Sequence, residues 1–190
     1  MTEQIKQYTE LVKSLMGKKR FTHSVNVADM CFKLATIHGE DSIKAYTAGI
    51  LHDIHKEIDP ELMKREVLAS GMNVDPVELD TQKLWHGIAG AYFCRTELKI
   101  DDEDIINAIR YHTVGRANMS RLEKIVYLGD LVSMERDYPE VEEFRKFTME
   151  DLDNAMFEAM KWSIPNTIGK GGKIPLCSME CYNCYWQYRK

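Results

Sequence analysis

Long hydrophobic runs are absent from this sequence of 190 residues, and their absence excludes a protein that spans a membrane. The more apolar stretches, such as residues 48–51, are much shorter than the roughly 20 residues that a transmembrane helix needs. The first twenty residues alternate charged and apolar side chains, so they do not resemble a signal peptide. We therefore expect a cytoplasmic protein with no membrane partner.

Cysteine, proline and glycine are also sparse. The five cysteines form an odd set and follow no secretion signal, which indicates a reducing compartment rather than a disulfide framework. Five prolines and eleven glycines separate long segments with helical periodicity. Alternating apolar and polar positions, the pattern of a half-buried strand, are essentially missing. The sequence therefore predicts an all-α fold.

The chain also has no excess of positively charged residues. The chain has 25 Lys and Arg against 30 Asp and Glu, a net charge of -5. Such a balance gives no general attraction to nucleic acid or to anionic membranes. It still allows a local cationic pocket for a small polyphosphate.

Helical periodicity and helix-start signals divide most of the chain into short, closely connected segments. One example is the capping box formed by Ser120 and Glu123. We expect helices over residues 4–16, 21–38, 43–54, 61–69, a short one from 75, 86–98, 102–112, 120–136, 140–147 and 151–164. Residues 1–168 are predicted to form one domain. Residues 169–190 are predicted to form a tail rich in Cys and Tyr that packs on the domain or on a partner.

Several polar side chains interrupt apolar segments. They are His23, His52, Asp53, His112 and Asp130. Burying such a group without a partner costs several kcal/mol, so each needs a hydrogen bond, a counter-charge or a metal. A divalent cation explains several of them converging on one core, although ordinary satisfied core residues remain the alternative. Imidazole and carboxylate ligands together suit Fe, Mn, Co or Zn.

The adjacent pair His52-Asp53 adds geometric information. Neighbouring residues on a helix point about 100° apart. One of them can therefore bind a metal terminally while the other reaches between two metals.

The order His23, His52-Asp53 and Asp130 resembles the HD-domain superfamily of metal-dependent phosphohydrolases. A longer ordered set is similar to the YqeK family within it. The matching strings are Arg20-x-x-His23, Leu51-His52-Asp53-x-x-Lys56, His86-Gly87, Tyr111-His112-Thr113-x-Gly115-Arg116 and Leu128-x-Asp130.

This resemblance implies an HD-domain helical bundle with the metal site in its core. It implies a symmetrical bis(5'-nucleosyl)-tetraphosphatase, which hydrolyses diadenosine tetraphosphate to two ADP with a metal-activated water. It also implies a dinuclear iron centre, with Mn, Co or Zn as alternatives. One metal would be held by His23, His52, Asp53 and Asp130, and the second by His86 and His112 with Asp53 bridging.

The resemblance also implies roles for the surrounding cations. Asp53 and Lys56 would be catalytic, Lys56 as a donor to the leaving ADP. The substrate-binding residues would be Lys56, Thr113, Arg116 and Arg136. The chain departs from the family at one place, because Ser133 and Met134 stand where the family usually has a Glu-Pro pair.

Two other functions stay open at this point. The chain could be another HD phosphohydrolase, acting on a deoxynucleotide, an alarmone or a mononucleotide. It could also be a non-catalytic regulatory or binding protein that keeps the HD core for its shape. His86 together with the string over residues 112–116 favours the tetraphosphatase. The aromatic tail allows a homodimer.

The tail also carries Cys177, Cys181 and Cys184, whose spacing suits a metal or an iron–sulfur cluster. Three thiols lack a fourth ligand, so we interpret them as ordinary structural residues.

Overall fold

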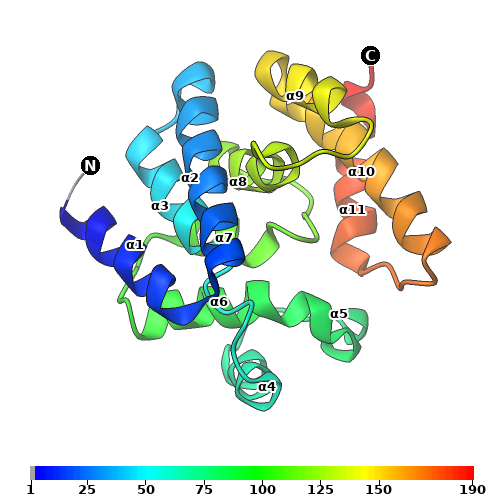
Figure 1. The fold of residues 1–190 in the computed structure, drawn as a ribbon. Coiled ribbons are helices and arrows are strands. Elements are labelled where there is room, and N and C mark those ends of the chain that lie inside the picture. The colour runs from blue at the N-terminus through cyan, green and yellow to red at the C-terminus, as the bar shows by residue number, and fades with distance from the viewer. Residues whose placement is uncertain (1–2) are drawn as a thin grey trace.

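A computed structural model describes residues 3–190, and over this range the chain folds into eleven α-helices and two short 3-10 helices without strands (Figure 1). The all-α prediction is confirmed. The helices in order are α1 (Glu3–Leu15), α2 (Lys18–His38), α3 (Ser42–Leu51), α4 (Pro60–Ala69), α5 (Pro76–Asp80), α6 (Trp85–Thr96), α7 (Glu103–Tyr111), α8 (Arg121–Val132), α9 (Val141–Glu150), α10 (Leu152–Gly169) and α11 (Leu176–Tyr185); η1 (Gln82–Leu84) and η2 (Trp186–Tyr188) are 3-10 helices.

Close packing of α2 against α3 and α8 forms the centre of the molecule (Figure 1). Small residues make this approach possible. A Cβ added at Gly49 of α3 would lie 2.8 Å from the Ala28 Cα of α2, and one at Gly129 of α8 would lie 2.7 Å from the Cys31 Sγ. Cys31 therefore fills the space that the two glycines leave open.

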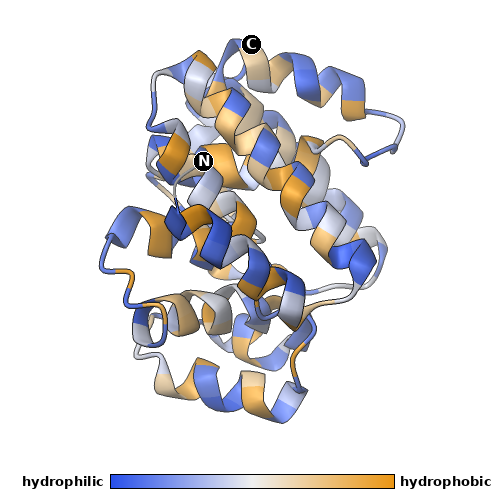
Figure 2. Ribbon diagram, turned by 60° about the vertical axis from the view of Figure 1, so that its left-hand side comes forward, coloured by the Kyte–Doolittle hydropathy of each residue, from blue (hydrophilic) through white to orange (hydrophobic). Residues whose placement is uncertain are grey.

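A second layer lies below this centre in Figure 1, where α6 crosses the bundle with α4 beneath it. It has its own small apolar cluster, which contains Met63, Val67, Ile88 and Ala89. Figure 2 shows apolar and polar residues interleaved along the helices, as expected for helices that bury one side. Among the described residues, no helix has the length and apolar character needed to cross a bilayer.

Most helix boundaries follow the predicted cap residues. The Ser120–Glu123 capping box is present, and a second one joins Asp75 to Glu78. Helix α8 is shorter than predicted, because Ser133 leaves the helical conformation with ψ 158°. The chain then turns back, which brings Arg136 against Asp130.

The C-terminal part is more helical than predicted. Helix α10 continues past Pro165 to Gly169, and residues 176–185 form an additional helix, α11. Helix α11 is tied to the bundle where the Ser178 hydroxyl donates to the Val114 carbonyl at 2.7 Å. The division of the chain at residue 168 stays a prediction.

Candidate metal centre

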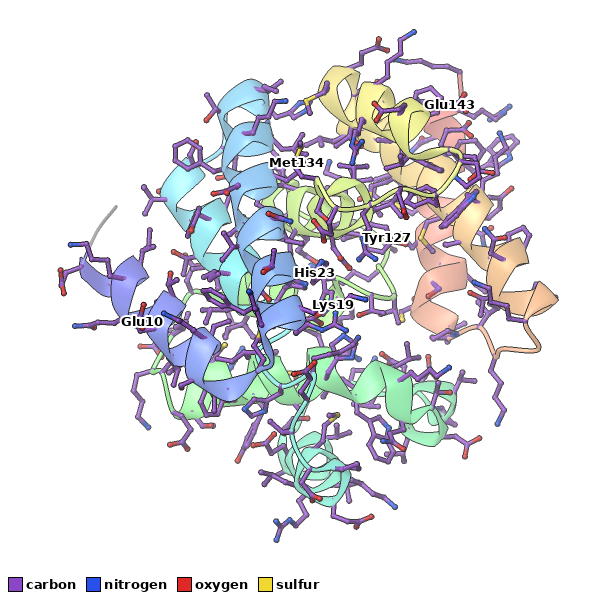
Figure 3. All side chains as sticks on the ribbon, in the orientation of Figure 1. Glu10, Lys19, His23, Tyr127, Met134 and Glu143 are labelled. Carbon is purple, nitrogen blue, oxygen red and sulfur yellow. The ribbon has the colours of Figure 1, made fainter. Side chains whose placement is uncertain are left out.

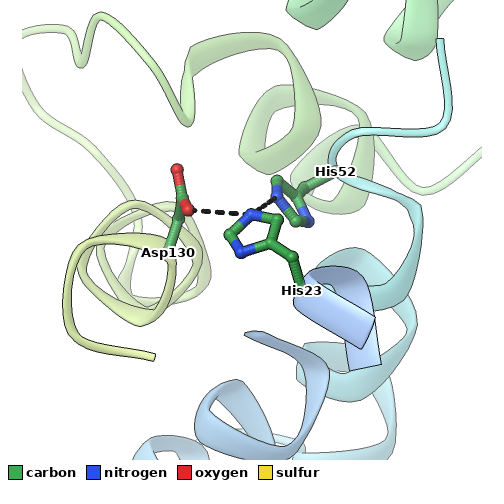
Figure 4. A group of neighbouring side chains, drawn as sticks. All are labelled: His23, His52 and Asp130. Carbon is green, nitrogen blue, oxygen red and sulfur yellow. Dashed lines mark hydrogen bonds and ion pairs between the residues drawn. The ribbon is translucent and has the colours of Figure 1, made fainter. Parts of the chain in front are cut away.

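Five helices bring the six predicted ligands into one buried place. His23 lies in α2 and Asp130 in α8, His86 is in the first turn of α6, and His52 and His112 directly follow α3 and α7. All four histidines and Asp53 are buried. Figure 4 shows His23 between His52 and Asp130, and Figure 3 shows where His23 leaves α2 on the side that faces α8.

Backbone carbonyls set the orientation of three imidazoles. The Nδ1 atoms of His52, His86 and His112 lie 2.6, 2.9 and 2.7 Å from the carbonyl oxygens of Gly49, Lys83 and Ile109. A carbonyl can only accept a hydrogen bond, so each Nδ1 carries the proton. Each Nε2 therefore presents its lone pair to the interior of the site, as in histidines that bind metals.

The Nε2 atoms of these imidazoles lie close to one another and to that of His23. The Nε2 atoms of His86 and His112 are 3.1 Å apart, and those of His52 and His23 are 3.3 Å apart. Two unprotonated nitrogens cannot hydrogen-bond to each other, and such a convergence of imidazole nitrogens is the arrangement of ligands around a bound cation.

Asp53 is the carboxylate that both groups of histidines share. Its Oδ1 lies 3.3 Å from the His86 Nε2 and 3.5 Å from the His112 Nε2, and its Oδ2 lies 3.6 Å from the His52 Nε2. The Oδ1 is fully buried and has no hydrogen-bond partner among the described residues. A buried carboxylate oxygen in this state is costly, and cations next to it remove that cost. The residues therefore fit a divalent metal site.

Two groups of three potential ligands lie in the cluster, and within each group the ligand atoms lie within 4.8 Å of one another. The first contains His23, His52 and Asp130, and the second contains His52, Asp53 and His112. His52 belongs to both groups, and the Asp53 Oδ2 lies 3.7 Å from the His23 Nε2 of the first group, which suits adjacent ions with a shared carboxylate. Whether two ions bind, and which residue holds each, stays a prediction.

Burial and neighbouring charges shift the pKa values of these groups toward the protonation states that bind a cation. Burial lowers the pKa of His52 to about 4 and the pKa of His86 well below its usual range. Both imidazoles are therefore neutral at pH 7, the form that binds metals. For Asp130, burial opposes ionisation, but His23, His52 and Arg136 outweigh it and keep the carboxyl pKa below its usual value.

Glu135 is a part of the site that the sequence did not reveal. Its Oε1 forms a very short contact with the His23 Nδ1, and its Oε2 accepts a 2.8 Å hydrogen bond from the Asn26 side chain. The Ser133 hydroxyl donates to the Oε1 at 2.9 Å. The carboxylate thus fixes His23 with its Nε2 toward Asp130, 3.2 Å away. The sequence offers no signal for this contact, because Glu135 stands in the turn after α8, next to Ser133 and Met134 where the family usually has a Glu-Pro pair.

We expect Glu135→Ala to weaken metal binding roughly tenfold, because outer partners of ligating histidines typically contribute that much or more to affinity. The measurement is a titration of metal-depleted protein with Mn²⁺ or Fe²⁺. Glu143→Ala is the control, because Glu143 lies on the exposed face of α9 (Figure 3). Unchanged affinity in Glu135→Ala would contradict the role of this carboxylate.

Three of the predicted substrate-binding residues border the cluster. The Lys56 Nζ lies 2.9 Å from the His86 Nε2, and the Thr113 hydroxyl lies 3.1 Å from the His112 Nε2. Arg136 bonds the Asp130 carboxylate through its Nη2 at 2.5 Å. Arg20, which the sequence offered only as part of a string, donates to the Asp53 Oδ2 at 2.8 Å. The cluster is therefore bordered by cations on several sides.

Arg116 has a different environment. Its Nε and Nη2 bond both oxygens of the buried Glu123 at 2.7 and 2.6 Å. Within residues 3–190 it makes no hydrogen bond or ion pair with the six predicted ligands. Its predicted contact with substrate stays a prediction, and the visible role of Arg116 is to neutralise Glu123 at the start of α8.

The remaining histidines point elsewhere. His55 pairs with Glu66 at 2.7 Å and packs against Phe93, and His38 at the end of α2 bonds the Thr148 carbonyl at 2.8 Å. In the tail, Cys181 is buried against Gly115, while Cys177 and Cys184 are partly exposed.

Three cavities open next to the cluster. One, of about 260 Å³, is bordered by His112, Asp130 and Arg136 and by the aromatic pair Tyr138 and Trp162, whose ring centres are 5.0 Å apart and stacked. Another, of about 820 Å³, is bordered by His86 and Lys56. The third, of about 570 Å³, is bordered by His23, Arg20 and Arg136. Anions that reach the cluster therefore have space on several sides of it.

Comparisons with known proteins identify the family of this chain and several relatives. A family model described as the HD domain matches residues 20–135. A symmetrical bis(5'-nucleosyl)-tetraphosphatase of Halalkalibacterium halodurans is 34% identical over 174 residues, 92% of each chain. One of Bacillus subtilis is 38% identical over 150 residues, 79% of this chain and 80% of the relative. The crystal structure of a predicted HD superfamily hydrolase involved in NAD metabolism, from Clostridium acetobutylicum, superposes with a TM-score of 0.92 at 35% identity and 97% coverage of both chains.

Proposed function

This chain belongs to the HD-domain family, and from that premise we propose that it is a metal-dependent phosphohydrolase that cleaves diadenosine tetraphosphate symmetrically into two ADP. The observation that carries the metal-dependent reaction is the set of imidazole Nε2 atoms that converge around the Asp53 carboxylate, whose Oδ1 has no hydrogen-bond partner among the described residues. The substrate comes from the names of the relatives, which share nearly the whole chain.

The ligands proposed are those of the cluster: His23, His52, Asp53, His86, His112 and Asp130. When bound there, divalent cations supply two kinds of chemistry, the acidification of a water molecule and the neutralisation of charge on phosphoryl oxygens. The mixed imidazole and carboxylate ligands suit Fe, Mn, Co or Zn, and we propose iron as the ion in the cell because the family resemblance implies it. Metal analysis of anaerobically purified protein tests this choice.

The chain's own cations would hold the tetraphosphate. Lys56, Arg20 and Arg136 border the cluster on different sides, and each can bind phosphoryl oxygens that the metal ligands do not reach. Because in-line displacement at phosphorus depends on positioning and charge neutralisation, these three residues would orient the bridge and stabilise charge that develops on it.

Lys56 is the best-placed residue to assist the leaving group. Burial lowers the pKa of its amine, which makes it a better proton donor than an exposed lysine. Its Nζ lies at the edge of the cluster on the side of the larger cavity, where a departing ADP would be held.

The test is product analysis in H₂¹⁸O. The metal-loaded protein is expected to convert diadenosine tetraphosphate to ADP alone, with one ¹⁸O in half of the ADP molecules, because one water oxygen enters per cleavage. AMP and ATP as products would contradict symmetrical cleavage. Bound metal without turnover of this substrate would contradict the proposed substrate and favour a different nucleotide.

A further inference from the structure

The larger cavity beside the cluster is lined by an excess of positive charge. It is bordered by four lysines, namely Lys56, Lys83, Lys170 and Lys173, against one carboxylate, Asp80. Asp80 is already paired with Lys173. Within residues 3–190, neither Lys83 nor Lys170 has a carboxylate within ion-pair distance. A cavity with unpaired cations attracts anions of matching size.

The loop that carries Lys170 and Lys173 is fixed in place. Its turn is closed by hydrogen bonds from the Gly171 and Gly172 amides to the Ile168 and Thr167 carbonyls, both at 2.9 Å. Gly171 has φ 71°, a conformation that glycine adopts without strain.

Two contacts attach this segment to the opposite wall of the cavity. Lys173 forms an ion pair with Asp80 at the end of α5, and the Leu176 amide donates to the Asp75 side chain at 2.8 Å. Lys170 and Lys173 therefore lie on a loop that a turn holds at its start and that contacts with Asp80 and Asp75 hold at its end.

The cavity is continuous with the reacting centre. His86 and Lys56 belong both to its lining and to the cluster, and the His86 imidazole lies 3.3 Å from the Asp53 carboxylate. The aromatic cavity reaches the cluster from another side, through His112 and Asp130. No predicted metal ligand among the described residues borders both cavities.

Symmetrical cleavage makes a particular demand on such a site. The central P–O–P linkage must lie at the cluster, so a complete nucleoside diphosphate extends from it in each of two directions. The aromatic cavity, with Tyr138 and Trp162, suits a base and its ribose. The lysine cavity has few aromatic groups and much positive charge, so it suits phosphates.

We propose, on the basis of the proposed function, that the lysine cavity binds the phosphates of one ADP half of the substrate, with Lys83 and Lys170 as the binding residues. The two identical halves of the substrate are then held by unlike surfaces. Lys173 serves to close the loop through Asp80 rather than to bind the phosphates.

The test compares two double variants of the metal-loaded, full-length protein. Lys83→Ala/Lys170→Ala removes the unpaired cations of the cavity. Lys33→Ala/Lys146→Ala removes two exposed lysines on α2 and α9 and is the matched control for net charge. For each protein we would measure KM and kcat for diadenosine tetraphosphate at low and high ionic strength, and inhibition by added ADP.

The cavity variant is expected to raise KM about tenfold at low ionic strength, because each charged hydrogen bond to phosphate contributes measurably even at a partly exposed site. Its KM should respond less to salt than that of the wild type, since fewer exposed charges remain to be screened. ADP should inhibit it more weakly. The control variant should match the wild type in KM, in the response of KM to salt and in inhibition by ADP.

The outcomes separate the two proposals. If the wild type forms ADP as sole product but the cavity variant keeps the wild-type KM, the role of the lysine cavity is wrong while the proposed function stands. If the wild type does not cleave diadenosine tetraphosphate, the proposed function fails and the cavity proposal fails with it. An equal rise in KM in both variants would indicate a general charge effect and would also contradict the cavity.

Discussion

Asp53→Asn is expected to lower turnover of diadenosine tetraphosphate by roughly a thousandfold or more, the largest effect of any single change in this chain. Asparagine has the shape of aspartate but lacks its charge. The Asp53 carboxylate faces the Nε2 atoms of His52, His86 and His112 within 3.6 Å. Removing its charge takes away a carboxylate that faces three of the predicted histidine ligands, so bound metal should fall together with activity.

The measurements are metal content by mass spectrometry and the rate of ADP formation. Asp29→Asn is the matched control, because Asp29 is exposed on α2. His38→Ala is a second control, because His38 ends the same helix that carries His23 but bonds the Thr148 carbonyl, away from the cluster. A variant of Asp53 with full metal content and wild-type turnover would refute the shared-ligand role. Circular dichroism checks that the variant keeps its helices.

Gly49→Ala is expected to have the largest effect on stability. An added Cβ would lie 2.8 Å from the Ala28 Cα, a backbone atom that cannot rotate away, and 3.1 Å from the Cys31 Sγ. Alanine favours a helix over glycine by about 1 kcal/mol, but overpacking at such a contact costs about 1–3 kcal/mol and requires α2 and α3 to separate. We expect the free energy of unfolding to fall and the melting temperature to drop by several degrees.

The same variant should weaken metal binding, because the two helices that separate carry His23 and lead into His52, whose Nε2 atoms are 3.3 Å apart. Gly169→Ala is the control. Gly169 is also a helical glycine, but nothing lies within 4 Å of its added Cβ. It should leave the melting temperature unchanged or slightly higher. Equal melting temperatures for the two variants would show that α2 and α3 tolerate the extra methyl group.

Local signals were sufficient for most helices, because caps and periodicity are properties of neighbouring residues. The capping box at Ser120 and Glu123 is an example. The predicted end of α8 was wrong by several residues, since Ser133 leaves the helix and Arg136 turns back to Asp130. The helix over residues 176–185 was missed. Its cysteines and aromatic residues have no strong helical period, and packing against α10 decides their conformation.

The candidate site was predictable in its members but not in its arrangement. Polar residues inside apolar helices already mark His23, His52, Asp53, His112 and Asp130, because an unpaired buried polar group is too costly to be accidental. Glu135 could not be found this way. It stands in a loop, 112 residues from His23 along the chain, and only the fold brings the two together.

Two arginines illustrate the same limit. Arg116 and Arg136 both follow strings that resemble the family, and the sequence treats them alike. In the folded chain Arg136 bonds Asp130 at the cluster, whereas both oxygens of the buried Glu123 engage Arg116. A charged side chain pairs with whatever opposite charge lies nearest, and that is a matter of three-dimensional distance.

The sequence by itself therefore determined the all-α fold, the positions of most helices and the identity of most of the polar residues that meet in the cluster. These depend on periodicity, caps and the cost of burying polar groups, which act locally. Tertiary structure alone decided that the imidazole lone pairs meet around Asp53, that Glu135 fixes His23, and that a loop near the C-terminus brings Lys170 to the cavity beside His86. These contacts join residues far apart in the chain, and only helix packing sets the distances between them.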